Sequence, residues 1–280
     1  MGMRDRWFKQ VDVFGTKPYL GNPVAVVLDA DGVSDTAMAA FARWTNLSET
    51  TFVLPPTENG ADYKVRIFTP GGEIPFAGHP TLGTCHAWLE AGNIPHYPGV
   101  VIQECGVGLV TLHASAGMAA FGAPPLIRSG ELEESVLKQA VDALGISRDQ
   151  VTASNWIDNG PGWLGLLLKD AETVPSLAPD PAALGSLAVG VIAPQPDGGE
   201  TDFEVRAFAP GHGVPEDPVT GSLNAGLAQW LIGAGLAPER YTVTQGTALE
   251  RSGLVRIFSR DRKIWIGGET TTCIDGTVKL

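Results

Sequence analysis

Val65-Arg66-Ile67-Phe68-Thr69-Pro70-Gly71 returns later in the chain as Val205-Arg206-Ala207-Phe208-Ala209-Pro210-Gly211. Each copy then runs through a proline into a glycine-containing helix start. There the copies read Gly78-His79-Pro80-Thr81-Leu82-Gly83-Thr84 and Glu216-Asp217-Pro218-Val219-Thr220-Gly221-Ser222. With the prolines aligned, histidine in the first copy matches aspartate in the second. This repeat predicts two similar domains with a site between them, and different chemistry on each side.

The repeat extends beyond these stretches. Short segments rich in Val, Ile, Phe and Thr, separated by Gly, Pro and Asp, predict hairpins in a curled antiparallel sheet. Ser34 predicts the N-cap of a helix over residues 35–45, and Asp180-Pro181 opens a matching helix. A further helix over 132–144, followed by Gly145, has no counterpart in the first half. We expect an α+β protein with domains 1–124 and 125–280, joined near Pro124-Pro125.

Composition narrows the class of partner. The chain has 280 residues, 44% of them hydrophobic, which is enough for two cores, and a formal net charge of −12. It has no block of lysines or arginines, so we expect no nucleic-acid partner and no anionic membrane surface. No apolar run approaches the ~18 residues that span a bilayer. Three scattered cysteines and a charged N-terminal segment favour a reduced, cytoplasmic protein.

The two predicted helix starts suit an anion. Unpaired backbone N–H groups and the positive end of the helix dipole lie there, and both favour a carboxylate. Proline and glycine also start helices for purely structural reasons. Two copies, each with a titratable residue just before the proline, favour a ligand site, and the expected ligand is a small anionic carboxylate.

Three residues near these helix starts could move protons. Glu49 lies at the entrance of an apolar strand, whereas Ala188 holds the matching place in the second half. Alternatively, Glu49 is a solvated surface residue, and His79 and Asp217 only cap helices. A buried carboxylate can take a proton from a carbon next to an unsaturated acid and return it elsewhere. The unequal halves favour one proton shuttle with helpers over symmetric racemisation.

Other chemistries have little support. Residues 160–165 match the letters of a dinucleotide motif, but they precede a predicted strand where that mechanism needs a helix. Cys85 and His86 are neighbours and have no further ligands at metal-binding spacing. We therefore expect neither a metal nor an organic cofactor.

Several stretches together resemble the phenazine-biosynthesis PhzF family of isomerases and epimerase-like proteins. They follow the family's order over nearly the whole chain and comprise Val11-Asp12-Val13-Phe14, Gly21-Asn22-Pro23, Asn46-Leu47-Ser48-Glu49-Thr50, Arg66-Ile67-Phe68-Thr69-Pro70, Gly78-His79-Pro80-Thr81-Leu82-Gly83, Glu216-Asp217-Pro218-Val219-Thr220-Gly221-Ser222 and Gln245-Gly246.

The resemblance implies the diaminopimelate-epimerase-like fold, in which two similar domains each wrap an antiparallel, barrel-like sheet around a central helix. It implies that Glu49 is the general acid/base, and that His79 and Asp217 position the substrate and assist proton transfer. The positions matching Gly78, Gly221 and Ser222 supply donors to a substrate carboxylate. The family works without metal or cofactor, and a homodimer is expected.

The chain departs from related enzymes at two places. Racemases and epimerases of this fold use a pair of cysteines at the helix starts, and none stands there in this sequence, which disfavours a two-thiol route. After Gln245-Gly246 the sequence continues to Glu250-Arg251-Ser252-Gly253, where the family usually has Gly-Arg-Pro-Ser. Two alternatives to an isomerase stay open, namely an epimerase with Asp217 as second base and a non-catalytic binder of small molecules.

Overall fold

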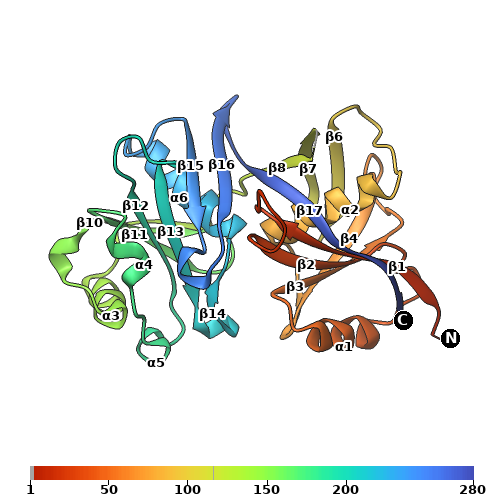
Figure 1. Cartoon of the computed structure of the whole chain (residues 1–280), viewed down its shortest axis with the longest axis horizontal. Helices are drawn as coiled ribbons and strands as arrows, with labels where there is room; N and C mark the ends of the chain where they lie inside the picture. Colours follow the sequence, from red (N-terminus) through yellow and green to blue (C-terminus); the bar gives the residue numbers. More distant parts are fainter. Residues whose placement is uncertain (1–2, 116) are drawn as a thin grey trace. The chain divides into compact units, whose positions relative to one another are not determined.

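The chain folds into two compact units. Figure 1 shows a computed structural model, which describes residues 3–115 and 117–280. Unit 1 comprises Met1–Gly122 and Gly267–Leu280, and unit 2 comprises Ala123–Ile266. The start of unit 2 lies close to the boundary expected at 124/125. We expected unit 2 to extend to the C-terminus, but it ends at Ile266, and the last 14 residues group with the first unit.

Unit 1 consists of a curled sheet and two helices. The helices are α1 (Asp35–Thr45) and α2 (Gly78–Glu90). The strands are β1 (Asp5–Val13), β2 (Asn22–Val27), β3 (Glu49–Leu54), β4 (Tyr63–Thr69), β5 (Gly72–Ile74), β6 (Val100–Cys105), β7 (Gly108–Ser115), β8 (Met118–Gly122) and the larger part of β17 (Lys263–Lys279).

The strand pairings of unit 1 close on themselves. They run from β1 through β2, β3, β4, β6, β7 and β8 to β17, which pairs again with β1. Most pairs are antiparallel, as expected, but β2–β3 and β4–β6 are parallel, so the sheet is mixed. Helices explain the difference, since α1 connects β2 to β3 and α2 lies between β5 and β6. A helical crossover brings the next strand back in the same direction.

Helix α2 is the central helix of this unit. It contacts β1, β2, β3, β7 and β8, and its residues from Gly78 to Cys85 are all buried. A Cβ atom at Gly83 would lie 2.3 Å from Cγ1 of Val24, so glycine is required for the helix to rest on the sheet. Helix α1 packs on another face, with Met38 in a cluster that includes Phe52 and Phe68. Ser34 caps α1, as predicted, by accepting a hydrogen bond from the Ala37 N–H.

Unit 2 contains a second set of paired strands and a second central helix. Its helices are α3 (Glu134–Leu144), α4 (Thr173–Ser176), α5 (Pro181–Leu184) and α6 (Gly221–Gly233), with 3₁₀ turns η1 (Arg148–Gln150), η2 (Pro210–His212) and η3 (Thr247–Leu249). Its strands are β9 (Arg128–Gly130), β10 (Val151–Asp158), β11 (Trp163–Leu168), β12 (Ala188–Pro194), β13 (Phe203–Ala209), β14 (Val214–Asp217), β15 (Arg240–Gln245) and β16 (Gly253–Arg260).

The pairing pattern of unit 2 follows that of unit 1. Strands β11 and β12 are parallel, as are β13 and β15, whereas β12–β13 and β15–β16 are antiparallel. Helix α6 is buried over most of its length. A Cβ atom at Gly226 would lie 2.5 Å from the carbonyl oxygen of Ile157 in β10, so this central helix also meets its sheet at a glycine. Helix α3 ends at Gly145 in the left-handed conformation, as predicted.

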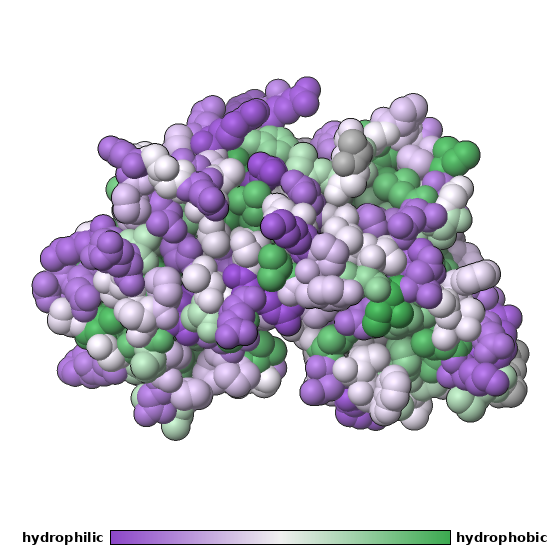
Figure 2. Space-filling model, viewed as in Figure 1, coloured by the Kyte–Doolittle hydropathy of each residue, from purple (hydrophilic) through white to green (hydrophobic). Residues whose placement is uncertain are grey.

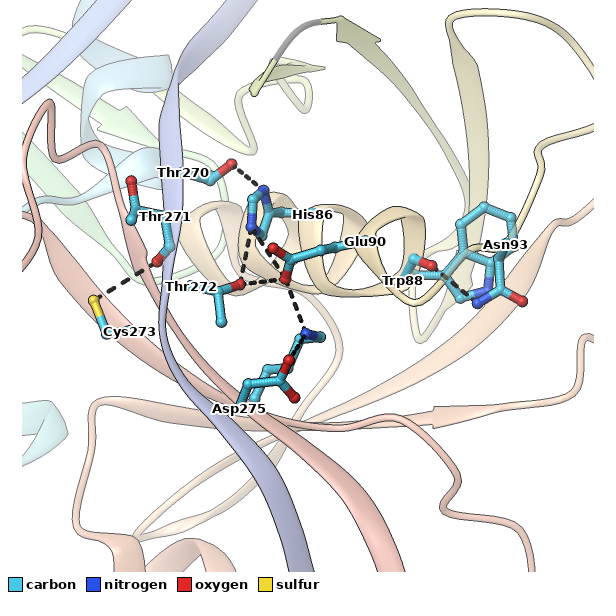
Figure 3. A network of polar contacts seen from close by, with 10 residues as sticks. His86, Trp88, Glu90, Asn93, Thr270, Thr271, Thr272, Cys273 and Asp275 are labelled. Carbon is cyan, nitrogen blue, oxygen red and sulfur yellow. Dashed lines mark hydrogen bonds and ion pairs between the residues drawn. The ribbon is translucent and has the colours of Figure 1, made fainter.

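A polar network explains why β17 belongs to unit 1. Figure 3 shows the His86 ring of α2 between Thr270 and Thr272 of β17, with Nδ1–Oγ1 and Nε2–Oγ1 distances of 2.9 and 3.0 Å. The Thr272 hydroxyl donates to Glu90, which also forms an ion pair with Lys9 of β1. These contacts, together with the β1–β17 ladder, attach the C-terminal strand to the central helix and first strand of the chain.

The surface carries both hydrophobic and hydrophilic residues. On the face drawn in Figure 2, hydrophobic residues form small separate patches among hydrophilic ones. Within the part of the chain that the structure describes, no helix has the length and apolar character needed to span a membrane.

Candidate functional site

Two ionisable side chains meet at the start of α2. Glu49 is the first residue of β3, where it pairs with Val24 of β2, and its side chain is 15% exposed. Its Oε2 lies 3.4 Å from Nδ1 of His79, the second residue of α2. The carboxylate is therefore largely enclosed and close to an imidazole, which is not the setting of a solvated surface glutamate.

His79 is a neutral imidazole near pH 7. Burial lowers the pKa of His79 to about 3, and a hydrogen bond with the Pro23 carbonyl only partly opposes that shift. Its Nε2 is buried and has no hydrogen-bond partner among the residues that the structure describes. A neutral imidazole has one N–H donor and one acceptor nitrogen. The contact with Glu49 is thus one between a carboxyl group and a neutral ring.

The N-terminus of α2 has no side-chain cap. Ala77 occupies the N-cap without a side-chain hydrogen bond, and the first turn has no acidic residue. Pro80, the third residue, lies in the first turn as predicted and has no N–H. Gly78 and His79 are therefore the donors of this turn. These two N–H groups and the helix dipole suit one carboxylate.

Helix α6 begins later than the sequence suggested. Its first residue is Gly221 and its N-cap is Thr220, so Pro218 does not lie in the first turn. Asp217 is the last residue of β14 rather than a helix cap. As in α2, no side chain caps the helix and its first turn has no acid.

Strand registers correct the alignment of the two helix starts. Ile67 pairs with Ile74 in unit 1, and Ala207 pairs with Asp217 in unit 2. Since Arg66-Ile67 and Arg206-Ala207 are the repeated stretch, Asp217 corresponds to Ile74. Counting on to the helices, Pro75 corresponds to Pro218, Gly78 to Gly221 and His79 to Ser222. The expected exchange of histidine for aspartate was therefore wrong, because it aligned Pro80 with Pro218.

The registers confirm the other expected inequality. Thr50 pairs with Phe68 in unit 1, and Val189 pairs with Phe208 in unit 2. The residue before each is Glu49 in the first case and Ala188 in the second. The carboxylate beside α2 thus has no equivalent beside α6.

Ser222 is oriented by its neighbours. Its Oγ accepts a hydrogen bond from the Trp163 indole at 3.0 Å, and its carbonyl accepts one from the Asn159 amide at 2.8 Å. With the indole occupying an acceptor position, the hydroxyl proton can be donated to a ligand. Ser222 is the second residue of α6, next to the buried Gly221.

Asp217 belongs to a network that we did not predict. Its Oδ2 accepts a hydrogen bond of 2.6 Å from the Thr220 hydroxyl, and its carbonyl accepts one from Gln245. Gln245 was noted only as part of a sequence motif, and Thr220 only as part of the repeat. Their separation of 25 positions along the chain gives no signal that they touch.

The predicted site residues therefore form two groups. Glu49, Gly78 and His79 gather at the start of α2 in unit 1, and Asp217, Gly221 and Ser222 gather at the start of α6 in unit 2. Across the described residues, no cluster of three or more His, Cys, Asp or Glu side chains could hold a metal ion. Cys85 is not part of either group, and burial raises the pKa of its thiol to about 12.

Comparison with known proteins places this arrangement in a family. Residues 11–276 match the family model described as phenazine biosynthesis-like protein, PhzC-PhzF. The chain belongs to the PhzF family. The sequence resemblance is thereby confirmed over almost the whole chain.

Relatives and a solved structure agree with this assignment. The chain is 37% identical to antisense-enhancing sequence 1 of Schizosaccharomyces pombe, over 98% of this chain and 99% of that one. It is 34% identical to trans-2,3-dihydro-3-hydroxyanthranilate isomerase of Pseudomonas chlororaphis, over 96% and 98% of the two chains. A PhzF-family crystal structure from Enterococcus faecalis superposes with a TM-score of 0.83 at 26% identity, covering 99% of this chain and 100% of that one.

Proposed function

We propose that this protein is a cofactor-independent isomerase that moves a proton on a small unsaturated or cyclic carboxylic acid. The proposal rests above all on one observation, the enclosed Glu49 carboxylate 3.4 Å from the neutral His79 ring at an uncapped helix start. The protein's membership of the PhzF family supports the reaction class, because relatives of this chain include an isomerase that acts on such an acid.

In this proposal Glu49 takes the proton from one carbon and returns it to another. His79 stays neutral and offers Nε2 as an acceptor to the substrate, so it helps without competing for the proton at neutral pH. The N–H groups at the helix starts and the Ser222 hydroxyl hold the carboxylate and stabilise the anion that forms. Asp217 assists from unit 2.

We also infer that the two units are diverged copies of one ancestral domain. They share the repeated stretch, the pattern of parallel and antiparallel pairs and a central helix with glycine at its first and sixth positions. Divergence left one glutamate in the pair, which fits a single shuttle better than two equal bases.

The test is proton transfer measured in deuterated water. The probes are cyclic and unsaturated carboxylic acids, beginning with trans-2,3-dihydro-3-hydroxyanthranilate, and NMR follows both isomerisation and deuterium uptake. Glu49→Gln keeps the shape of the side chain but cannot take a proton, so we expect turnover to fall by about 10³-fold. Glu90→Gln is the control, since Glu90 is a glutamate of unit 1 at the last position of α2, at the opposite end of that helix from Glu49.

The outcomes separate the proposal from its two alternatives. Unchanged turnover in folded Glu49→Gln would refute the role of Glu49. Deuterium at an inverted centre, lost in Asp217→Asn, would indicate an epimerase with Asp217 as a second base. Bound acids that return unchanged after long incubation would indicate a non-catalytic binder.

A further inference from the structure

We propose that Thr220 and Gln245 are positioning residues that hold the Asp217 carboxylate in one orientation for the reaction. The inference deepens the proposed function and rests on it for the role of Asp217. Neither residue touches the substrate in this proposal. Their action is exerted through a chain of hydrogen bonds within unit 2.

The orientation of the Gln245 side-chain amide is fixed by its surroundings. Gln245 is fully buried, and its Oε1 accepts hydrogen bonds from the Thr220 backbone N–H at 3.1 Å and from Asn224 Nδ2 at 2.9 Å. A backbone N–H can only donate, so the amide atom facing it must be the oxygen. The NH₂ group therefore points the other way, to the Thr220 hydroxyl at 2.9 Å and the Asp217 carbonyl at 3.1 Å.

This orientation also fixes the direction of the next hydrogen bond. The Thr220 Oγ1 accepts a hydrogen bond from Gln245. Its own single O–H is therefore left to donate to Oδ2 of Asp217 at 2.6 Å. A short hydrogen bond to a carboxylate is stronger than one between neutral groups. The chain from Gln245 through Thr220 thus donates toward the carboxylate, which limits the rotation of the Asp217 side chain.

Unit 1 lacks this network at the equivalent positions. Asp217 corresponds to Ile74 and Thr220 to Ala77, as the β5 and β14 registers require. Lys64 of unit 1 corresponds to Glu204 of unit 2. Lys64 pairs with Glu104 and Glu204 pairs with Thr244, so the next residues, Cys105 and Gln245, also correspond.

A pair of glycine contacts supports the same correspondence. A Cβ atom at Gly106 would lie 2.6 Å from Cα of Pro75, and one at Gly246 would lie 2.8 Å from the Pro218 carbonyl oxygen. The two turns are therefore built alike, although one carries cysteine and the other glutamine. A central helix can begin at this place without the polar network. Thr220 and Gln245 occur together in the unit that has the aspartate, which favours a role tied to Asp217 over one in folding.

The direct test is the titration of Asp217, which needs no substrate. Aspartate carboxyl carbons are labelled with ¹³C, and the Asp217 signal is assigned by its loss in Asp217→Asn. Thr220→Val removes the donor with little change in shape, and we expect the Asp217 titration midpoint to rise by roughly one pH unit. Thr220→Ser keeps the hydroxyl and restores the wild-type midpoint.

A matched control tests for general effects of losing a buried hydroxyl. Thr84 is a fully buried threonine of α2 whose hydroxyl donates to Thr51 at 2.8 Å. Thr84→Val should leave the Asp217 midpoint unchanged. If Thr220→Val does not fold, Gln245→Met supplies the second variant, because it removes the donor to Thr220 and should raise the midpoint by a smaller amount.

Kinetics on the substrate identified in the deuterium experiment complete the test. We expect Thr220→Val to lower kcat about tenfold with little change in KM, and Thr220→Ser to recover it. In an Asp217→Asn background the same change should have no further effect, since both act through one group. An unmoved midpoint, or an equal loss of kcat in the Asp217→Asn background, would overturn the inference. Failure of Glu49→Gln to reduce turnover would refute the proposed function and leave the titration result unaffected.

Discussion

The starts of α2 and α6 are alike in backbone and different in chemistry. Each helix has 13 residues, begins with glycine, lacks a side-chain cap and meets its sheet at a second glycine. The features that the two starts share are the ones that close packing of a central helix demands. The features that differ are polar, with Glu49 and His79 beside α2, and Asp217, Thr220 and Ser222 beside α6. In the proposed function, the reacting groups are therefore the residues that the common framework does not require.

Moving the glutamate from one unit to the other is the strongest test of this comparison. We expect Glu49→Gln combined with Ala188→Glu to stay about 10³-fold below wild-type turnover, because Ser222 rather than His79 stands at the start of α6. The deuterium exchange assay measures this effect. Ala188→Gln in the same background controls for burying a larger polar side chain. Recovery of turnover by the glutamate alone would mean that the two helix starts are interchangeable.

The repeated arginine–glutamate pair offers a structural test. Arg206 and Glu216 form a bidentate pair with side chains 6% and 13% exposed, whereas the Arg66–Glu73 pair is 22% and 43% exposed. Glu216→Gln leaves a buried guanidinium without its partner, and we expect a loss of about 3 kcal/mol in unfolding free energy. Glu73→Gln should cost under about 1 kcal/mol, because solvent screens the exposed pair. Urea denaturation measures both, and equal losses would contradict the difference in burial.

We expect His79 to make the stability of the protein depend on pH. The matching residue of unit 2, Ser222, does not titrate and adds no such effect. Burial depresses the pKa of His79 to about 3 from an ordinary 6.5, so between these values the unfolded chain binds one more proton than the folded one. This contribution to stability is complete above pH 6.5 and is lost progressively as the pH falls toward 3. At pH 5 the loss should be about 2 kcal/mol.

The effect of His79 is separated from that of other groups by comparing variants. His79→Gln should show a smaller decrease in unfolding free energy between pH 7.5 and pH 5 than the wild type, by about those 2 kcal/mol. His212→Gln, on an exposed turn of unit 2, should behave as the wild type does. Parallel pH curves for His79→Gln and wild type would show that the ring is not held neutral by burial.

The smallest effects concern the helix caps that the two units have at corresponding places. Ser34 accepts one hydrogen bond at the start of α1, and Asp180 accepts two at the start of α5. We expect Ser34→Ala and Asp180→Ala each to reduce the unfolding free energy by about 1 kcal/mol. Thermal unfolding of each variant beside wild type measures this. A loss in only one unit would show that the other helix start does not depend on its cap.

The sequence led to much of the site, but not to its internal connections. His79 and Ser222 were predicted from motifs because each stands next to a glycine or proline near a helix start, and Glu49 because it stands at the entrance of an apolar strand. The correspondence of Asp217 with His79 was wrong, since two prolines gave a plausible alignment that only strand register could reject. The Thr220–Gln245 contact was missed for a related reason, because a side-chain hydrogen bond across 25 residues leaves no periodic pattern.

The sequence by itself determined the repeat, the family, the helix starts and the residues with ionisable groups, because these depend on local chemistry and on the order of residues. Tertiary structure alone decided that β17 returns to unit 1, that two strand pairs in each unit are parallel and that His79 is neutral. Each of these depends on which distant segments enclose a residue. Burial and register are properties of the packed chain, and local sequence does not encode them.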